Sequence, residues 1–455
     1  MKTNFFVLLL LTGFLCAEAQ TWTWSEDQLP YACDIISATV MDDSIFISQG
    51  RWDDNSFPNI AQIYDIGENQ WETVQLQSTP RCFAAAVSAN GMVFFAGGIT
   101  LSNSVSKDDI DVYNKATGEW TFELHLSEAR NYLGVTACEN KVFFAGGINP
   151  AEGAFYNVID IYDTETGELS IINLTEQKCM VGTAAAGGKV FFAGGSQGTN
   201  QATDLVEIYD ISTGEWTYDT LSEARALTAT VNYGDKVYFA GGAKPNAIGS
   251  DVVDIYNVVT GEWDTMTLSS PRVVKALNVM DALIFAGEAE FISLTNGLPY
   301  FPNGIIDIYY PETGQWDYAV SQLNPARHFY GCAAYENKAY FAGGGYPDDP
   351  MSLINILEYP TVGASNNKFQ ESSFRVHPNP FTSAIGIDYN LKRPENASFI
   401  IYNQLGKKVA EMLDEYRQQG DQQLIFNAEK LTPGIYFCVL KTSEGVQTKK
   451  IVKLK

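Results

Sequence analysis

Six basic residues recur along the chain in one sequence context, each just before a run of small and apolar residues. They lie 47 to 55 residues apart: Arg81, Arg130, Lys178, Arg225, Arg272 and Arg327. Arginine binds carboxylate and sulfate groups through two parallel hydrogen bonds. Where the repeating units form a ring, these six groups crowd the mouth of its central channel. There they predict a cationic pocket for a carboxylate, a sulfate or an acidic peptide. The competing interpretation, which the recurrence favours, is that each residue pairs with a carboxylate such as Glu128 or Glu223 and fastens neighbouring units together.

Few other groups in the sequence are typical of catalysis. The chain has three histidines, His125, His328 and His377, which are too few for a multi-histidine metal site. No HExxH, GxSxG or P-loop motif occurs. His328 stays a candidate ligand contact because it follows Arg327. Acidic clusters at 53–55, 108–109 and 348–349 offer oxygen ligands for Ca²⁺, but solvated loop carboxylates are the favoured interpretation. We therefore assign no catalytic residue, no metal and no cofactor.

Aromatic residues in the longer loops are a second set of candidate contacts. Trp52 and Tyr300 are among them. Exposed aromatic rings beside polar groups suit contacts with sugars or peptides, although they can equally pack the loops down. The segment 288–303 is the longest and most individual of these loops, so recognition is expected there first.

A repeat organises the middle of the chain and places these residues. Phe94-Phe95-Ala96-Gly97-Gly98 recurs as 143–147, 191–195, 238–242 and 340–344, with weaker copies at 45–50 and 284–288. A Tyr followed by Thr-Gly-Glu-Trp comes about fifteen residues later. Alternating apolar residues predict strands, and the Thr-Gly step predicts a hairpin turn. Each unit therefore has four strands, near 83–88, 92–96, 109–113 and 119–123 in the second unit.

Gly-Gly, then Tyr, then Trp at this spacing resembles the Kelch repeat of β-propellers, over about 21–360. The resemblance implies an all-β fold in which the four-stranded units form a ring. Second strands end at seven places, so we predict seven blades, with the strand around Trp22-Thr23-Trp24 closing the last one. A six-bladed ring with an irregular unit around 288–303 is the alternative.

The last eighty residues differ from the propeller in charge and pattern. Residues 361–455 have a net charge of +4, whereas 20–360 have −29. Short alternating strands predict a small antiparallel β-sandwich over 374–455, after a polar linker at 361–373. His377-Pro378-Asn379-Pro380-Phe381, Leu405-Gly406-Lys407 and Pro433-Gly434-Ile435-Tyr436 occur in that order. Together they resemble the type A C-terminal sorting domain of the type IX secretion system. The resemblance makes Pro378, Asn379, Pro380, Gly406, Gly434 and Tyr436 sorting-motif residues and the secretion machinery a partner.

The N-terminus and the cysteines bear on the compartment. A basic Lys2, an apolar run and Ala17-Glu18-Ala19 predict a signal peptide over 1–19; a lipoprotein signal using Cys16 is the rival. No other apolar run reaches the length of a membrane-spanning helix. The six remaining cysteines are widely spaced and read as small buried hydrophobes, with a Cys33–Cys82 bridge as the alternative.

These observations lead to one preferred function and two alternatives. The net charge of −25 argues against nucleic acid or an anionic membrane as the main partner. The preferred function is a secreted or surface-attached binding module, at the outer face of the outer membrane, for a glycan or protein ligand. The alternatives are an enzyme on the same face, resembling the sialic-acid mutarotases among secreted Kelch propellers, and a passive adhesion component. Such an enzyme needs a general base beside the arginines, for which Glu288 and Glu290 are the candidates.

Overall fold

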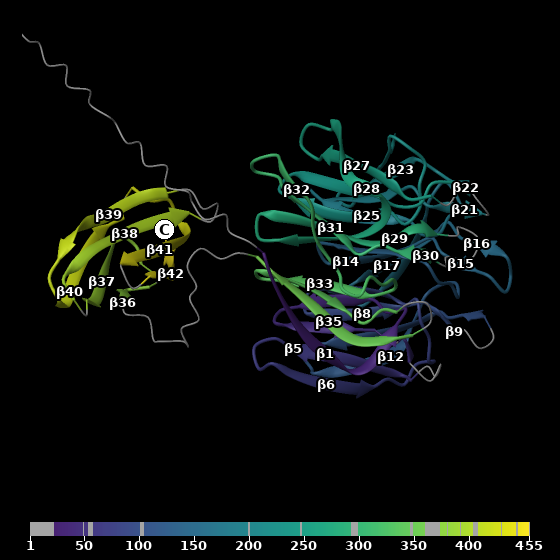
Figure 1. Cartoon of the computed structure of the whole chain (residues 1–455). Helices are drawn as coiled ribbons and strands as arrows, with labels where there is room; N and C mark the ends of the chain where they lie inside the picture. Colours follow the sequence, from purple (N-terminus) through teal and green to yellow (C-terminus); the bar gives the residue numbers. More distant parts are fainter. Residues whose placement is uncertain are drawn as a thin grey trace, which may run out of the picture. The chain divides into compact units, whose positions relative to one another are not determined.

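The computed structural model consists of two compact units (Figure 1). Described are residues 22–48, 50–52, 58–100, 104–198, 201–245, 248–292, 299–345, 349–359, 374–379, 381–391, 393–403, 408–428, 430–442 and 445–454. The predicted signal peptide and linker lie outside these ranges and stay predictions. No helix among the described residues is long and apolar enough to cross a membrane.

The second unit has the four strands that its sequence predicts. They are β7 (Ala85–Ala89), β8 (Met92–Ala96), β11 (Asp109–Asn114) and β12 (Glu119–His125), in the order β12-β11-β8-β7. Gly118 has a φ of 71° in the turn before β12, so the Thr-Gly step supplies the left-handed residue that this turn needs. Consecutive antiparallel strands make one meander, which we describe as strands a, b, c and d.

Neighbouring units repeat this order. Unit 1 has β2 (Ala38–Met41), β3 (Ser44–Ile47), β5 (Ile60–Asp65) and β6 (Gln70–Gln75). Unit 3 has β13 (Gly134–Cys138), β14 (Lys141–Ala145), β17 (Val158–Asp163) and β18 (Leu169–Asn173). Unit 4 has β19 (Gly182–Ala186), β20 (Lys189–Ala193), β23 (Leu205–Asp210) and β24 (Trp216–Thr220). Short two-stranded pairs lie in the b–c loops of units 2 to 4: β9 (Ile99–Thr100) with β10 (Val105–Ser106), β15 (Ile148–Asn149) with β16 (Ala154–Phe155), and β21 (Ser196–Gly198) with β22 (Gln201–Ala202).

Units 5 and 6 share one long strand. Strand β28 (Trp263–Val279) pairs first with β27 (Ser250–Asn257) and then with β29 (Ala282–Ile292). It thus links β25 (Ala229–Tyr233) and β26 (Lys236–Ala240) to β30 (Pro299–Pro302), β31 (Ile305–Tyr310) and β32 (Gln315–Gln322) in one eight-stranded sheet. Because this sheet spans two sequence repeats, sheets do not delimit blades here, and the number of blades stays a prediction.

The N-terminal strand lies where the sequence predicts it. Strand β1 (Thr23–Asp34) pairs antiparallel with β35 (Met351–Glu358) and extends the sheet of β33 (Gly331–Tyr335) and β34 (Lys338–Ala342). It also pairs with β4 (Arg51–Trp52). The a strand of unit 1, β2, contacts both β7 and β33, so the first and last units are neighbours although they are far apart in sequence.

Aromatic side chains fill the space between sheets. Phe94, Phe95, Phe143 and Phe144 of the b strands have no exposed surface. The repeated Tyr and Trp pair across strands c and d, with ring centroids 5.4 Å apart for Tyr113 and Trp120. Trp120 also belongs to the apolar cluster of Met41 and Phe46, from the preceding unit. The repeated Trp therefore covers a neighbouring sheet.

The Gly-Gly pairs are required by close approach of neighbouring backbones. A Cβ at Gly97 would lie 2.5 Å from the Arg130 carbonyl oxygen of the next unit, and one at Gly98 would lie 2.6 Å from the Cys82 carbonyl oxygen. Both glycines also have positive φ. The described cysteines are free thiols, so the bridge between Cys33 and Cys82 is absent from this structure.

The C-terminal unit consists of two antiparallel sheets around one core. One holds β36 (Phe374–His377), β37 (Ala384–Leu391) and β40 (Gly420–Asn427); the other holds β38 (Glu395–Asn403), β39 (Lys408–Arg417), β41 (Gly434–Thr442) and β42 (Gly445–Lys453). Phe374, Ile387, Phe399 and Ile451 come from both sheets and share one buried cluster. The predicted β-sandwich is therefore present.

Candidate functional site

The six recurring basic side chains do not form an open ring. Each has no exposed surface, and five make an ion pair with a carboxylate on strand c of their own unit. The ion-pair distances are 2.9 Å for Arg81–Asp111, 2.5 Å for Arg130–Asp160, 2.8 Å for Lys178–Glu207 and 2.7 Å for Arg272–Asp307, and Arg225 pairs with Asp254. The predicted cationic pocket is thus wrong in its placement, because burial hides the charges and the carboxylates neutralise them. We call these pairs the clamps.

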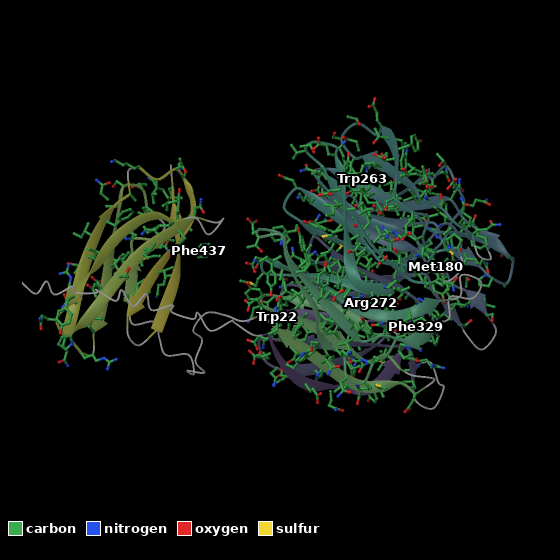
Figure 2. All side chains as sticks on the ribbon, turned by 45° about the horizontal axis from the view of Figure 1, so that its top comes forward. Trp22, Met180, Trp263, Arg272, Phe329 and Phe437 are labelled. Atoms are coloured by element: carbon green, nitrogen blue, oxygen red, sulfur yellow. The ribbon has the colours of Figure 1, made fainter. Side chains whose placement is uncertain are left out.

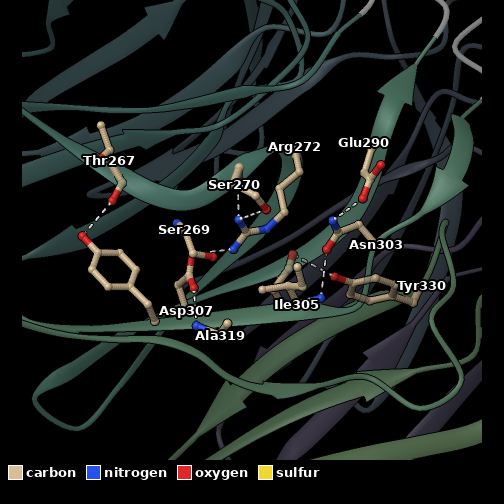
Figure 3. A network of polar contacts seen from close by, with 12 residues as sticks. Thr267, Ser269, Ser270, Arg272, Glu290, Asn303, Ile305, Asp307, Ala319 and Tyr330 are labelled. Atoms are coloured by element: carbon tan, nitrogen blue, oxygen red, sulfur yellow. Dashed lines mark hydrogen bonds and ion pairs between the residues drawn. The ribbon is translucent and has the colours of Figure 1, made fainter.

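The Arg272 clamp shows how densely the carboxylate is bonded (Figure 3). Asp307 accepts hydrogen bonds from the Ser269 backbone N–H at 2.8 Å and the Ala319 backbone N–H at 2.7 Å, besides the bond from Arg272. Burial alone raises the pKa of Asp307, but the Arg272 charge and these donors outweigh it and lower that pKa. Arg272 also donates to the Ser270 carbonyl oxygen at 2.8 Å.

Four of the clamps, those of Arg130, Lys178, Arg225 and Arg272, also connect neighbouring units through the backbone of the cation. The Arg130 carbonyl oxygen accepts the Gly98 N–H at 3.0 Å, and the Lys178 carbonyl oxygen accepts the Gly147 N–H at 2.9 Å. The side chain therefore binds its own strand c while the main chain binds the unit before it. This supports the fastening interpretation, but with other partners: Glu223 lies 3.8 Å from Arg225 as a secondary contact.

Partner residues change together from unit to unit. A shorter cation meets a longer anion in Lys178–Glu207. Arg327 meets an amide and donates to Asn355 Oδ1 at 2.7 Å. At the corresponding place in unit 1, Gln62 Nε2 lies 3.3 Å from the Cys33 sulfur. The sequence signal for these partners, missed above, is the acidic residue two positions before the repeated Tyr.

A ring of apolar residues lies two positions after Cys33, Arg81, Arg130, Lys178, Arg225 and Arg327. Ile35, Phe83, Tyr132, Met180, Leu227 and Phe329 all have φ between 53° and 57°, and we call them the apolar ring. For side chains other than glycine this left-handed conformation costs about 1–2 kcal/mol per residue, more for a β-branched residue such as Ile35. Because the same strained conformation recurs at the same position in six units, the surrounding structure must impose it.

The apolar ring brings consecutive units into direct contact around the axis. The Met180 N–H donates to the Tyr132 carbonyl oxygen and the Leu227 N–H to that of Met180, both at 2.9 Å. The Phe83 ring centroid lies 4.7 Å from that of Tyr132 and 5.2 Å from that of Phe329, two units away. Met180, Phe329 and Arg272 can be found in Figure 2. The central channel is therefore narrowed by these side chains at the start of the a strands.

The b–c loops lie beside the apolar ring and make the face that we call the b–c face. Backbone bridges join Cys82 to Ile99 and Asn131 to Ile148, and so tie the residue before the ring to the first residue of the loop. Ile148 and Phe155 pack against the cluster of Met180. His328 is 7% exposed here and its ring centroid lies 5.0 Å from that of Phe329.

Other candidates from the sequence are only partly described. Trp52 lies in β4 and Tyr300 in β30, but their side chains are outside the described part of the structure, as are residues 53–55 and 346–348. Asp108, Asp109 and His125 offer ligand atoms within 4.8 Å of one another, and His125 Nδ1 lies 3.8 Å from Asp108 Oδ2. Nothing else in this solvent-accessible group indicates a cation.

One charged pair lies inside the channel. Lys275 Nζ is 3.6 Å from Glu288 Oε2, with side-chain exposures of 37% and 10%. Glu288 Oε1 accepts the Phe329 backbone N–H at 2.9 Å. Burial by itself lowers the pKa of Lys275, but the Glu288 carboxylate outweighs it and leaves that pKa raised. The sequence predicts Glu288 as a candidate base beside arginines, whereas the structure places it beside a lysine.

The sorting-motif residues have structural roles in the C-terminal unit. Asn379 Oδ1 accepts the Val452 N–H at 2.9 Å, and Tyr436 donates its hydroxyl hydrogen to the Thr432 carbonyl oxygen at 2.8 Å. Gly434 begins β41 with a φ of 156°. Pro378 is described, whereas Pro380 and Gly406 lie outside the described residues.

Comparison with known families matches both parts of the chain. A secretion system C-terminal sorting domain covers residues 375–454, and a Kelch motif covers 177–218. The Kelch match includes the Lys178–Glu207 clamp. The chain is thus a Kelch-type β-propeller with a sorting domain of the type IX secretion system, which makes it a secreted propeller and implies the secretion machinery as a partner.

Similarity to individual proteins is limited. Mouse Kelch-like protein 40 is 29% identical over 114 residues, which are 24% of this chain and 18% of the mouse protein. The match thus spans less than a fifth of the mouse relative. A solved structure titled "Structure of YjhT" is 16% identical, with a TM-score of 0.49, over 64% of this chain and 98% of that chain. These similarities do not indicate a ligand.

Proposed function

We propose that this secreted propeller is a binding module for a glycan or a protein ligand, which it takes at the b–c face. One observation carries the proposal: five units share the clamps and six have an apolar-ring residue, whereas their b–c loops differ. Ile148 and Phe155 of one loop and Ala202 of the next pack beside the ring, and Ile248 of a third is 46% exposed. Variable loops on a repeated scaffold are the usual position for recognition.

The charge of the b–c face indicates the kind of ligand. With the clamp cations buried, the face presents exposed carboxylates, namely Glu128, Glu152, Asp204, Glu290 and Asp349. Lys244, a cation on the same loops, lies 3.9 Å from Glu223. Negative potential repels anionic partners and attracts cationic ones. A neutral glycan or a basic protein segment therefore fits better than the acidic ligand that the sequence predicts.

An enzyme on this face gains no support from the described geometry. That hypothesis requires a general base beside accessible arginines, and the clamp arginines have no exposed surface. Surface attachment at the outer membrane and a passive role in adhesion stay alternatives within the same secreted class.

An array of immobilised ligands tests the proposal with the purified full chain. The array holds neutral, sialylated and sulfated glycans with basic and acidic peptides, at low and high salt. We expect binding to neutral glycans or to basic peptides, and only the latter should weaken in salt. Ile248→Asp should weaken binding at least tenfold. Val259→Asp is the matched control, since Val259 is 72% exposed in the opposite c–d turn.

Two results contradict the proposal. One is a blank on every arm of the array with folded protein. The other is binding that Val259→Asp abolishes and Ile248→Asp leaves intact, which would move the site to the opposite face.

A further inference from the structure

Unit 6 departs from the repeat at three linked positions. Val274 occupies the place of the apolar-ring residue but lies inside β28, where a bulge separates Val273 from Val274. Lys275 stands where other units have uncharged residues, and Glu288 stands where they have the second glycine. Bulges re-aim side chains and are enriched beside active sites, and local departures from a consistent pattern concentrate at functional sites.

The structure explains how a glutamate replaces that glycine. In unit 2, β8 ends at Ala96 and the chain turns through Gly97 and Gly98. In unit 6, β29 continues to Ile292 and pairs with β28 up to Val273 and Ala289. Because the strand does not turn, no positive φ is needed at position 288 and a side chain fits. Its carboxylate lies toward the channel beside Lys275.

The pair lies in a cavity of suitable size. Two adjoining parts of the channel, of about 190 Å³ and 320 Å³, both include Tyr132, Leu227, Lys275 and Glu288 in their walls. Lys275 and Glu288 are the charged residues among the described residues that line these two parts. Small-molecule sites have volumes of about 300–1,000 Å³ with a few converging polar groups.

The polar groups of the wall are incompletely matched by the protein. The Lys275 ammonium offers three donors, and Glu288 at 3.6 Å is its ion-pair partner. The buried Thr228 hydroxyl, one unit upstream in the same wall, has no hydrogen-bond partner among the described residues. In contrast, Thr183 and Thr230 use their hydroxyls on backbone carbonyls of neighbouring a strands.

We propose that this part of the channel binds a small neutral polyhydroxyl molecule of monosaccharide size, whose vicinal hydroxyls bridge Lys275 and Glu288. Lysine donates to one hydroxyl oxygen and the carboxylate accepts from the next. The pair has no net charge, so enclosing an ionic ligand would leave a charge uncompensated at high desolvation cost. Leu133, Val135 and Val181 supply apolar wall for the C–H face of a sugar ring. This site is separate from the b–c face and goes beyond the function proposed for it.

Titration calorimetry of the full chain with free sugars tests the site. The neutral arm holds glucose, galactose, mannose, fucose and N-acetylglucosamine; the charged arms hold N-acetylneuraminic acid and glucuronic acid. We expect at least one neutral sugar to bind and the charged arms to give no heat. Lys275→Met and Glu288→Gln should each weaken binding at least tenfold, and Lys244→Met, a loop lysine outside the cavity, should not.

A labelling experiment decides the matter if the variants fail to fold. Cys332 lines the same cavity and is half-buried, whereas the other described cysteines are buried. Burial raises the pKa of its thiol to about 11, so labelling with methyl methanethiosulfonate is run at pH 9. The bound sugar should slow Cys332 labelling in the wild-type chain. Three results would overturn the proposal, whatever the b–c face binds. They are no binding in the neutral arm, a preference for a charged ligand, and unchanged affinity in folded Lys275→Met and Glu288→Gln.

Discussion

Replacing Arg130 by methionine tests whether the clamps serve stability rather than anion binding. Arg130 has no exposed surface and pairs with Asp160 at 2.5 Å, and it also donates to the Phe144 carbonyl oxygen at 3.0 Å. Arg130→Met leaves the Asp160 carboxylate buried with the Ser127 N–H as its remaining partner, at 3.1 Å. Removing one member of a buried pair costs about 3–5 kcal/mol, because the other charge stays uncompensated.

The double variant should recover most of that loss. Burial lowers the pKa of Arg130 more than Asp160 raises it, and Arg130 Nε and Nη1 have no partner among the described residues. The pair is therefore costly to desolvate, and replacing both members by apolar side chains of similar volume is often neutral or stabilising. Arg130→Met with Asp160→Leu should thus fall within about 1 kcal/mol of the wild type. Because either single change leaves a buried charge unpaired, the coupling free energy should exceed about 3 kcal/mol in magnitude.

Urea unfolding followed by tryptophan fluorescence measures these differences in the full chain. All eight tryptophans lie before residue 317, so the signal reports the propeller and not the C-terminal unit. Lys141→Met is the matched control, because Lys141 pairs with Asp163 at 2.5 Å in the same unit but both side chains are partly exposed. It should cost far less, since solvent screens the pair. The reasoning would be refuted if Lys141→Met lost as much unfolding free energy as Arg130→Met, or if the double variant were as unstable as Arg130→Met.

Three further predictions use the same unfolding assay. Lys178→Arg should destabilise the propeller, because the longer cation does not fit opposite Glu207. Adding Glu207→Asp should restore the stability, since the pair then keeps its combined length. Equal stability of the single and the double variant would contradict the clamp geometry. The pKa of Asp307 is lowered in the folded protein, so the stability that its carboxylate contributes is complete above about pH 4 and is lost as the pH falls. Asp307→Asn should therefore flatten the dependence of the unfolding free energy on pH between about 3 and 5. An unchanged slope would refute this. Met280 is 57% exposed with a φ of 58° in an a–b turn, so Met280→Asn should stabilise by about 1 kcal/mol, whereas a loss would show that its side chain contributes to packing.

The sequence alone determined the repeat and its strands. Alternation between small, apolar and polar residues is local, and so is the turn signal of Thr-Gly, so each unit could be predicted without reference to the others. The closing strand at Trp22–Trp24 also followed, because the missing fourth strand of the last unit had to come from elsewhere in the chain. The order of the sorting-domain residues could likewise be read from the sequence alone.

Only the tertiary structure decided where the charges lie. The sequence places Arg130 next to a loop, but burial depends on Asp160 thirty residues later and on the Gly98 N–H of the unit before it. The channel pair depends on a bulge at Val273 and on the continuation of β29 past Gly287. Both features arise from contacts between strands whose spacing is set by the whole ring, and a pattern that repeats within single units holds no information about the axis on which they converge.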